Sequence, residues 1–324
     1  MNEKLRTICD TVSKNIQTAS TFYKIEYKSS FVAYGITNSD CEPSLDKIEE
    51  CKQLIKEQVG SSYTLGMYAP RMMMVSKASR SDDPLGTVNK IKETYGIFSK
   101  IFGESATVAT LSALLADYPG DINVLAAKSK EIMDILKKRH PVLGVSSSDH
   151  HIIALMAASD KSADEVINEA DRLFDAMKKE FRFAKEDAYT LSYMLSSLSE
   201  PFEWKMKAAI ALRDDLKASK AGFGGYRTIT MLAPLTLMSM RTDRSVLVNQ
   251  IKEADKFFSE QKIIGGTFGL GDSLRHMLAA ACVLKAEGED ENALSMAEYL
   301  TVMSCQIQIK AEQDSSSATV VTTI

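Results

Sequence analysis

Apolar residues recur along this chain in blocks about 41 residues apart, and that spacing predicts how the chain is built. Each block has an apolar stretch, a polar break and then an amphipathic stretch rich in Lys, Glu and Asp. A unit of this size cannot bury its apolar face alone, so it must stack on its neighbours, as helical-hairpin repeats do. Seven landmark residues lie at equivalent points of successive blocks, the last three slightly out of register: Val32, Met73, Leu114, Leu155, Met194, Leu237 and Ala280.

The unit at residues 144–182 shows the plan of one hairpin. Gly144 is suited to ending the preceding helix, and the side-chain oxygens of residues 146–149 can cap the next one. The first helix, around residues 150–158, is apolar nearly all the way round, so we expect it to be buried on most sides. The second helix, over residues 165–179, is amphipathic. Its predicted buried face consists of Val166, Ile167, Ala170, Leu173, Phe174 and Met177.

Other units follow the same plan, with apolar helices such as TLSALLA and amphipathic helices such as SVLVNQIKEADKFF. Pro70 and Pro234 each precede a landmark by three residues, where proline fits a first helical turn. No sustained alternation of apolar and polar residues predicts a strand. We therefore expect an all-α fold of about seven stacked helical hairpins, arranged as an α/α superhelix or an α/α-toroid-like array. Residues 1–312 are expected to form a single helical-repeat domain, and residues 313–324 a flexible C-terminal tail.

Charge and composition argue against two classes of partner. With a formal net charge of −4, the chain lacks the basic surplus that nucleic-acid binding by overall attraction needs. The basic clusters at residues 137–139 and 178–179 lie at the ends of predicted helices, where cations complement the helix dipole. No run of about 18 apolar residues predicts a membrane span, and residues 1–15 lack the apolar core of a signal peptide.

Five scattered cysteines indicate reduced thiols, so we expect a cytoplasmic protein.

Glycines gather in the loops that lead into the apolar helices, and stacking would bring those loops to one edge. Two of them, residues 221–226 and 265–271, resemble the Gly-Gly-Phe turns of prenyltransferase and terpene-cyclase toroids. The sequence lacks the Asp-Cys-His zinc set and the aspartate-rich motif of those enzymes. The resemblance therefore implies a toroidal shape more than an activity. The alternative is that these glycines simply end the amphipathic helices.

If this edge holds a site, Arg227, Asp272, Arg275 and His276 are its candidate catalytic residues, because they directly follow the two glycine turns. Either arginine could hold an anion, and His276 could carry a proton. The alternative is that Asp272 and Arg275 pair with each other at i, i+3 spacing. His276 would then be a partly buried helix residue.

The string Asp149, His150 and His151 is the candidate metal site, since a similar string occurs in one class of metal-dependent phosphoesterases. Successive helical residues point about 100° apart, however, so three neighbours cannot all face one ion. The alternative is that Asp149 starts a helix and the histidines occupy its first turn. On this interpretation we expect no metal and no other cofactor.

Several long segments resemble a known family. Over residues 68–310 the chain is similar to proteins catalogued as domain of unknown function number four thousand and three. Because that family has no established activity, the resemblance implies a bacterial origin and an all-helical fold but supplies no catalytic residue. Later repeats of the family often carry a histidine where this chain has Ser192 or Tyr193. The segments that carry the resemblance include YAPRMMMVSKASRSDDPLGTVNKIKETYGIFSKIF, ATVATLSALLADYPGD and IIALMAASDKSADEVINEADRLFDAMKKEF.

A strong repeat without a convincing catalytic set predicts a binding module without catalysis, whose partner is an unknown protein or small-molecule ligand. The alternative is an α/α-toroid enzyme that acts on an anionic or isoprenoid-like substrate at the glycine-rich edge. A pocket in which Arg227, Arg275 and His276 converge would favour the enzyme.

Overall fold

The computed structural model describes residues 1–22, 28–60, 65, 68–139, 149–180, 185–221, 231–265 and 270–288. Over these residues the chain forms helices and no strand, so the predicted all-α fold class is confirmed there. The described residues contain fifteen helices: α1 (Glu3–Phe22), α2 (Lys28–Thr37), α3 (Leu45–Val59), α5 (Tyr68–Arg80), α6 (Pro84–Phe102), α7 (Ala106–Leu115), α8 (Ile122–Arg139), α9 (Asp149–Ala157), α10 (Ala163–Met177), α11 (Lys185–Ser196), α12 (Phe202–Ala218), α13 (Leu232–Met238), α14 (Arg244–Ser259), α15 (Lys262–Gly265) and α16 (Asp272–Glu287).

The chain divides into two compact units. The first is assembled from three segments that are far apart in the sequence: Met1–Glu42, Glu180–Leu191 and Glu203–Ile324, of which residues 289–324 lie outside the described part. The second consists of Pro43–Lys179 and Ser192–Phe202.

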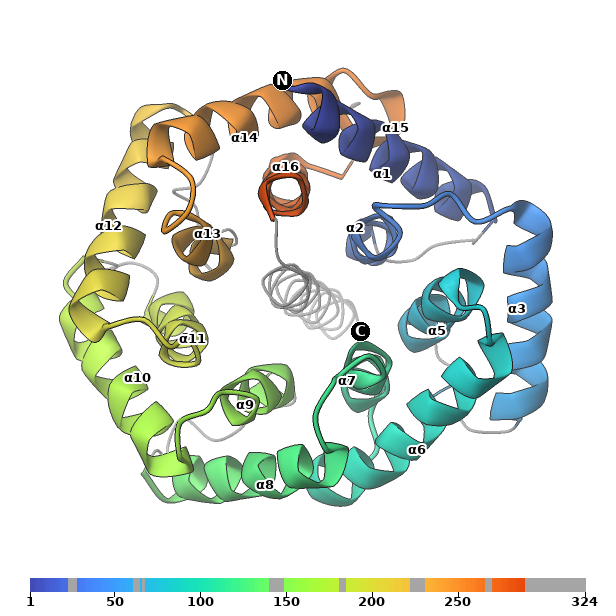
Figure 1. Ribbon diagram of the computed structural model, residues 1–324, viewed down its shortest axis with the longest axis horizontal. Coiled ribbons are helices and arrows are strands. Elements are labelled where there is room, and N and C mark those ends of the chain that lie inside the picture. The colour runs from blue at the N-terminus through green and yellow to red at the C-terminus, as the bar shows by residue number, and fades with distance from the viewer. Residues whose placement is uncertain are drawn as a thin grey trace, which may run out of the picture. The chain divides into compact units, whose positions relative to one another are not determined.

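The second unit is built from two layers of helices. In Figure 1, α5, α7 and α9 stand side by side in one layer, and α3, α6, α8 and α10 form the other. Helices that follow one another in the chain pack together: α3 on α5, α5 on α6, α6 on α7, and α8 on α9. Within the first layer, α7 also contacts both α5 and α9. Each helix of this unit is therefore held by its neighbours in sequence.

The apolar layer owes its burial to small residues placed between large ones. Every residue of α7 from Val108 to Leu115 is buried, and so is every residue of α9 from His150 to Ala157. Alanine and serine side chains let neighbouring helices approach closely, while Leu, Ile and Met fill the space between them. A helix that is apolar on all sides is kept from water only if other helices cover all of its sides. The burial predicted for residues 150–158 is confirmed from His150 to Ala157.

The other layer consists of amphipathic helices, as α10 illustrates. It begins with a capping box, in which the Ser162 hydroxyl accepts from the Glu165 N–H and the Glu165 carboxylate accepts from the Ser162 N–H at 2.8 Å. Phe174, predicted for the buried face, is only half-buried. The other five predicted residues are buried together with Ala163: Val166, Ile167, Ala170, Leu173 and Met177.

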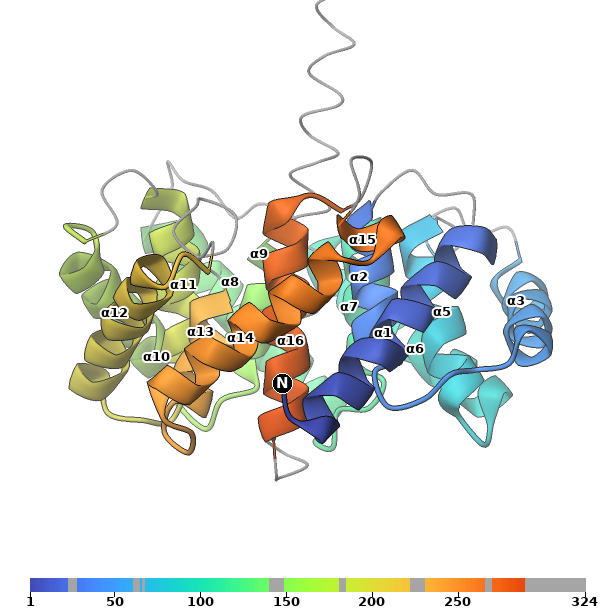
Figure 2. The ribbon, with the colours of Figure 1, turned by 90° about the horizontal axis from the view of Figure 1, so that it is seen from above.

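Helix α16 forms the centre of the first unit. It packs against α14, α1, α2 and α13, and Figure 2 shows α14 crossing it obliquely. Ten of its 16 residues are buried, including the whole run Met277–Leu284. This uninterrupted run, MLAAACVL in the sequence, is covered because neighbours lie on several sides of the helix.

Each of the seven landmark residues lies in a different helix. These helices are α2, α5, α7, α9, α11, α13 and α16, and every landmark except the half-buried Leu237 is buried. Pro70 and Pro234 are the third residues of α5 and α13, so their predicted place in a first turn is confirmed.

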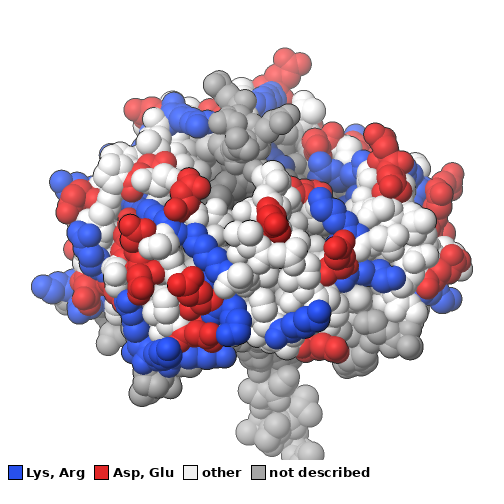
Figure 3. Space-filling model, turned by 60° about the horizontal axis from the view of Figure 1, so that its bottom comes forward, with Lys and Arg blue, Asp and Glu red and all other residues white. Residues whose placement is uncertain are grey.

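Charged side chains of both signs are interspersed on the face shown in Figure 3. The predicted placement of two basic clusters is confirmed, because residues 137–139 form the last turn of α8 and Lys178 caps the end of α10. Among the described helices, none combines the length and the apolar character that crossing a membrane requires.

Candidate functional site

Asp272, Arg275 and His276 lie in the first turns of α16, directly after Gly271. Gly271 has a φ of 83°, a left-handed conformation that glycine adopts without strain. Arg275 Nη1 donates to Asp272 Oδ1 at 2.8 Å, so the ion pair suggested by the i, i+3 spacing is present. The same guanidinium also donates from Nε to Asp255 Oδ1, at 2.8 Å.

Asp255 also belongs to this cluster, although no pattern in the sequence indicated that it would. It lies on α14, its side chain is 20% exposed, and it joins α14 to α16 through Arg275. Burial lowers the pKa of the Arg275 guanidinium, but the hydrogen bonds and charges of Asp255 and Asp272 outweigh it and leave that pKa raised. Arg275 is therefore held in its charged form between two carboxylates.

His276 completes the cluster on the same turn. Its Nε2 lies 3.5 Å from Asp255 Oδ1, and its side chain is 12% exposed. Burial lowers the pKa of His276, and Asp255 opposes this effect while the Arg275 charge reinforces it. The imidazole is therefore neutral at neutral pH, where it can accept a proton but has no positive charge to offer an anion.

The rest of the predicted glycine-rich edge is described only in part. Arg227 and the turn at residues 222–230 lie outside the described residues, as do residues 266–269. The described glycines favour the structural interpretation. Gly60 and Gly103 follow the last residues of α3 and α6, and each donates its N–H to a carbonyl of the last turn.

Asp149, His150 and His151 occupy the first turn of α9. The His150 ring stacks on Phe102 with 4.4 Å between ring centroids and 11° between planes. His151 is 1% exposed, and burial, followed by the nearby His150, lowers its pKa to about 3. Both imidazoles thus belong to the packed interior. Within the described residues, no group of three or more His, Cys, Asp or Glu side chains is arranged to hold a metal ion.

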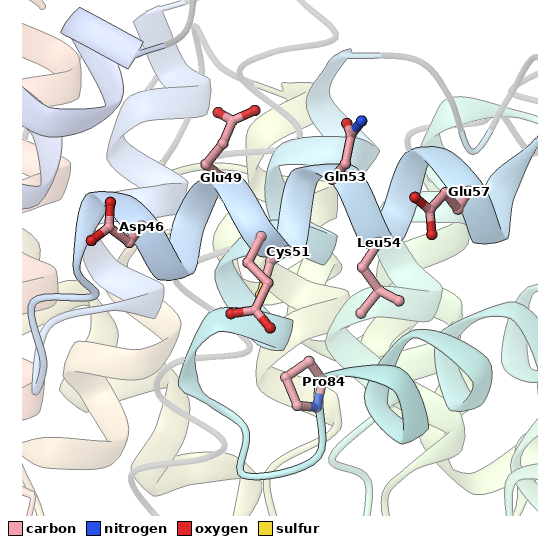
Figure 4. Close-up of a pocket in the computed structure, with 8 residues that line it drawn as sticks. Asp46, Glu49, Cys51, Gln53, Leu54, Glu57 and Pro84 are labelled. Atoms are coloured by element: carbon pink, nitrogen blue, oxygen red, sulfur yellow. The ribbon is translucent and has the colours of Figure 1, made fainter.

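A groove lies on the second unit, between α3 and the beginning of α6. It encloses about 600 Å³, and its lining residues are Asp46, Glu49, Glu50, Cys51, Gln53, Leu54, Glu57 and Pro84. Figure 4 shows Leu54 pointing toward the side on which Pro84 lies, while Glu49 and Gln53 point away from it. The groove therefore combines an apolar side with a row of carboxylates along α3.

Three of the four carboxylates in this groove stand without a partner. Glu49 pairs with Lys52 at 3.1 Å. The other three carboxylates are all exposed, and none forms an ion pair or a side-chain hydrogen bond with any described residue: Asp46, Glu50 and Glu57. The lining of the groove contains no Lys or Arg, so the charge it carries is negative only, although α3 itself has three lysines.

Cys51 lies under the carboxylates and does not behave as a nucleophile. It is fully buried, and burial raises the pKa of its thiol; the Lys47 charge opposes this effect and Glu50 adds to it, so the pKa stays raised. Because the thiolate is the reactive form, this cysteine is inert at neutral pH. The groove thus offers binding surface and no evident group for covalent chemistry.

Comparison with known proteins places the chain in a family. The family model described as "Protein of unknown function (DUF4003)" matches residues 14–314. No curated protein and no solved structure matches the chain.

Proposed function

The chain belongs to DUF4003, a family of proteins of unknown function, and we propose that it binds a partner protein, without catalysis, in the groove between α3 and α6. One observation carries this proposal: three carboxylates without an ion pair among the described residues stand beside an apolar surface in an open groove. Protein interaction sites commonly combine an apolar centre with a polar rim.

The geometry of the α16 cluster supports a structural role for Arg275. The charge of this guanidinium is already balanced by the carboxylates of Asp255 and Asp272, which weakens its attraction for an anionic substrate. The next residue, His276, is neutral at pH 7, and its Nε2 lies 3.5 Å from the carboxylate of Asp255. Both features favour an interhelical link over an enzyme site.

We also infer that the helical pairs are copies of one unit about 41 residues long, stacked as an α/α superhelix or a toroid-like array. The regular placement of the landmark residues in seven separate helices supports this inference. A cytoplasmic location is supported by Cys9, Cys41, Cys51 and Cys282, which are all free thiols.

The proposed function is tested by purifying the tagged full chain from its native cells with any bound proteins. The groove variant is Glu50→Gln/Glu57→Gln, which removes two unpaired carboxylates. The matched control is Glu93→Gln/Glu131→Gln, which removes two exposed carboxylates of α6 and α8 that likewise have no ion pair among the described residues.

The expected result is a partner that wild type and control retain and the groove variant loses. Retention of every partner by the groove variant would contradict the proposed site. Loss of a partner in Arg275→Ala but not in the groove variant would place the site at α16 only if circular dichroism shows Arg275→Ala to be as stably folded as wild type.

A further inference from the structure

Glu50 and Glu57 are placed against the preferences of their own helix, whereas Asp46 lies in the first turn of α3, where a carboxylate suits the helix dipole. Asp46 and Glu50 are four residues apart on α3, where like charges repel. Glu57 lies in the last turn, where a carboxylate faces the negative end of the helix dipole. Substituting Glu50 and Glu57 would relieve α3, so the placement of these two residues is better explained by a partner than by the stability of the helix.

Helix α10 of the same unit provides an internal comparison. It also carries many carboxylates on an amphipathic helix, yet each of them has a partner within the protein. These pairs are Asp164 and Asp171 with Arg139, Glu165 with Ser162, Glu169 with Lys161, and Asp175 with Lys178. The row of three unpaired carboxylates on α3 therefore has no counterpart on α10, although single unpaired carboxylates also occur on α6 and α8.

Apolar side chains accompany the unpaired charges. Leu54 and Pro84 line the groove. Leu45, which precedes Asp46, is 57% exposed, and Leu85, which follows Pro84, is 44% exposed. These two leucines do not line the groove but are next in sequence to residues that do, and their exposure favours a partner that covers more than the groove itself. A purely polar cation would satisfy the carboxylates and leave this apolar surface exposed.

The spacing of these carboxylates indicates the length and the secondary structure of the partner segment that would bind them. From Asp46 to Glu57 the row follows about three turns of α3, a length of roughly 16 Å. A second helix laid along α3 would present cations at matching intervals from one stripe and apolar residues from the neighbouring stripe.

We propose that the groove between α3 and α6 binds an amphipathic helix of a partner protein, with Lys or Arg facing Asp46, Glu50 and Glu57 and apolar residues against Leu54 and Pro84. This inference rests on the proposed function and adds the chemistry of the partner. The carboxylates supply charge complementarity and orientation, and the apolar side supplies the area that is removed from water.

The test uses the full chain and two fluorescein-labelled peptides about three helical turns long. One is an amphipathic peptide with a lysine stripe and a leucine stripe, and the other has the same composition in scrambled order. Fluorescence anisotropy at physiological ionic strength measures binding to wild type, to Glu50→Gln/Glu57→Gln and to Glu93→Gln/Glu131→Gln. Thermal unfolding by circular dichroism checks that each variant is folded.

We expect saturable binding of the amphipathic peptide, weakened about fivefold to tenfold by the groove substitutions and changed less than about twofold by the control. The groove variant should be at least as stable as wild type, because its substitutions relieve repulsion within α3. Equal binding of the scrambled peptide, or equal loss in both variants, would reduce the effect to bulk charge and overturn the inference.

Failure of this inference can be told apart from failure of the proposed function. If neither peptide binds but purification still yields a partner that the groove variant loses, the cationic helix is wrong and the groove remains the binding site. If no groove-dependent partner is found either, both proposals are wrong.

Discussion

Asp255 Oδ1 on α14 lies 2.8 Å from Nε of Arg275 on α16 and thereby joins two helices of the first unit. Both side chains are at least four-fifths buried, with 20% and 15% exposed. The same oxygen is 3.5 Å from His276. One carboxylate thus contacts two of the three described residues of the predicted catalytic set, and its removal should lower the stability of the protein.

Asp255→Asn is expected to lower the free energy of unfolding by about 1–3 kcal/mol, because it leaves the Arg275 charge with a weaker partner in a mostly buried place. Urea denaturation measures this change. The control Glu260→Gln, at an exposed cap with no side-chain partner among the described residues, should change the free energy by less than about 0.5 kcal/mol. Equal effects of the two substitutions would show that the Asp255 link contributes nothing.

Stability should fall in acid because His151 is buried in its neutral form. Its pKa in the folded state is about 3, whereas an unfolded histidine titrates near 6.5. The unfolded chain therefore binds the proton more readily, and the contribution to stability is complete above about pH 6.5 and lost progressively toward pH 3. His276, whose pKa is also lowered, adds to the loss in the same direction.

Between pH 7 and pH 4.5, His151 alone should cost about 3 kcal/mol of unfolding free energy. Urea denaturation at both pH values measures the loss. The variant His151→Gln should have a clearly smaller pH dependence, although its stability at pH 7 is also lower. An identical dependence in variant and wild type would mean that His151 is accessible to protons in the folded state.

Lys161 contributes more to stability than its place on the surface suggests. Its ammonium donates to the carbonyls of Ser196 and Leu198, at 2.7 and 2.6 Å, and pairs with Glu169 at 2.6 Å. Lys161→Met should lower the unfolding free energy by about 2 kcal/mol, because the carbonyls at the end of α11 lose a charged donor. Thermal and urea denaturation measure the change.

Lys130 serves as the matched control for Lys161. It pairs with Asp134 at 2.7 Å within α8, but its side chain is 60% exposed. Lys130→Met should therefore cost no more than about 0.5 kcal/mol. A cost for Lys161→Met as small as this one would contradict the assigned role.

Cysteine reactivity should follow burial. Cys9 on α1 and Cys282 on α16 are fully buried, and burial together with Cys9 raises the pKa of the Cys282 thiol well above its ordinary value. With iodoacetamide at neutral pH, the half-buried Cys41 should be alkylated at least about tenfold faster than either. Peptide mass spectrometry of the native protein gives the rates. Equal rates would mean that α1 separates readily from α16.

Local features of this fold could be predicted from the sequence because they depend on residues close together in the chain. The spacing of Leu173 and Met177 sets the buried face of α10, and the spacing of Asp272 and Arg275 sets their ion pair. The first-turn positions of Pro70 and Pro234 follow from the missing N–H of proline. Each needs only the geometry of one helix.

Features that depend on how two helices are aligned could not be predicted in this way. Asp255 is 20 residues from Arg275, and nothing in the sequence of α14 indicates which residue faces α16. The groove needs Pro84 of α6 beside Leu54 of α3, an arrangement set by packing between helices. The single domain over residues 1–312 stays a prediction, as do the roles of Arg227 and of the tail at residues 313–324.

The most direct test of the account is hydrogen–deuterium exchange of the full chain, read by mass spectrometry, with and without the amphipathic lysine–leucine peptide. We predict added protection in α3, residues 45–59, and at the start of α6, with no change in α16. Protection centred on residues 270–288, or none in α3, would contradict the claim that this protein works by binding a partner in the groove between α3 and α6.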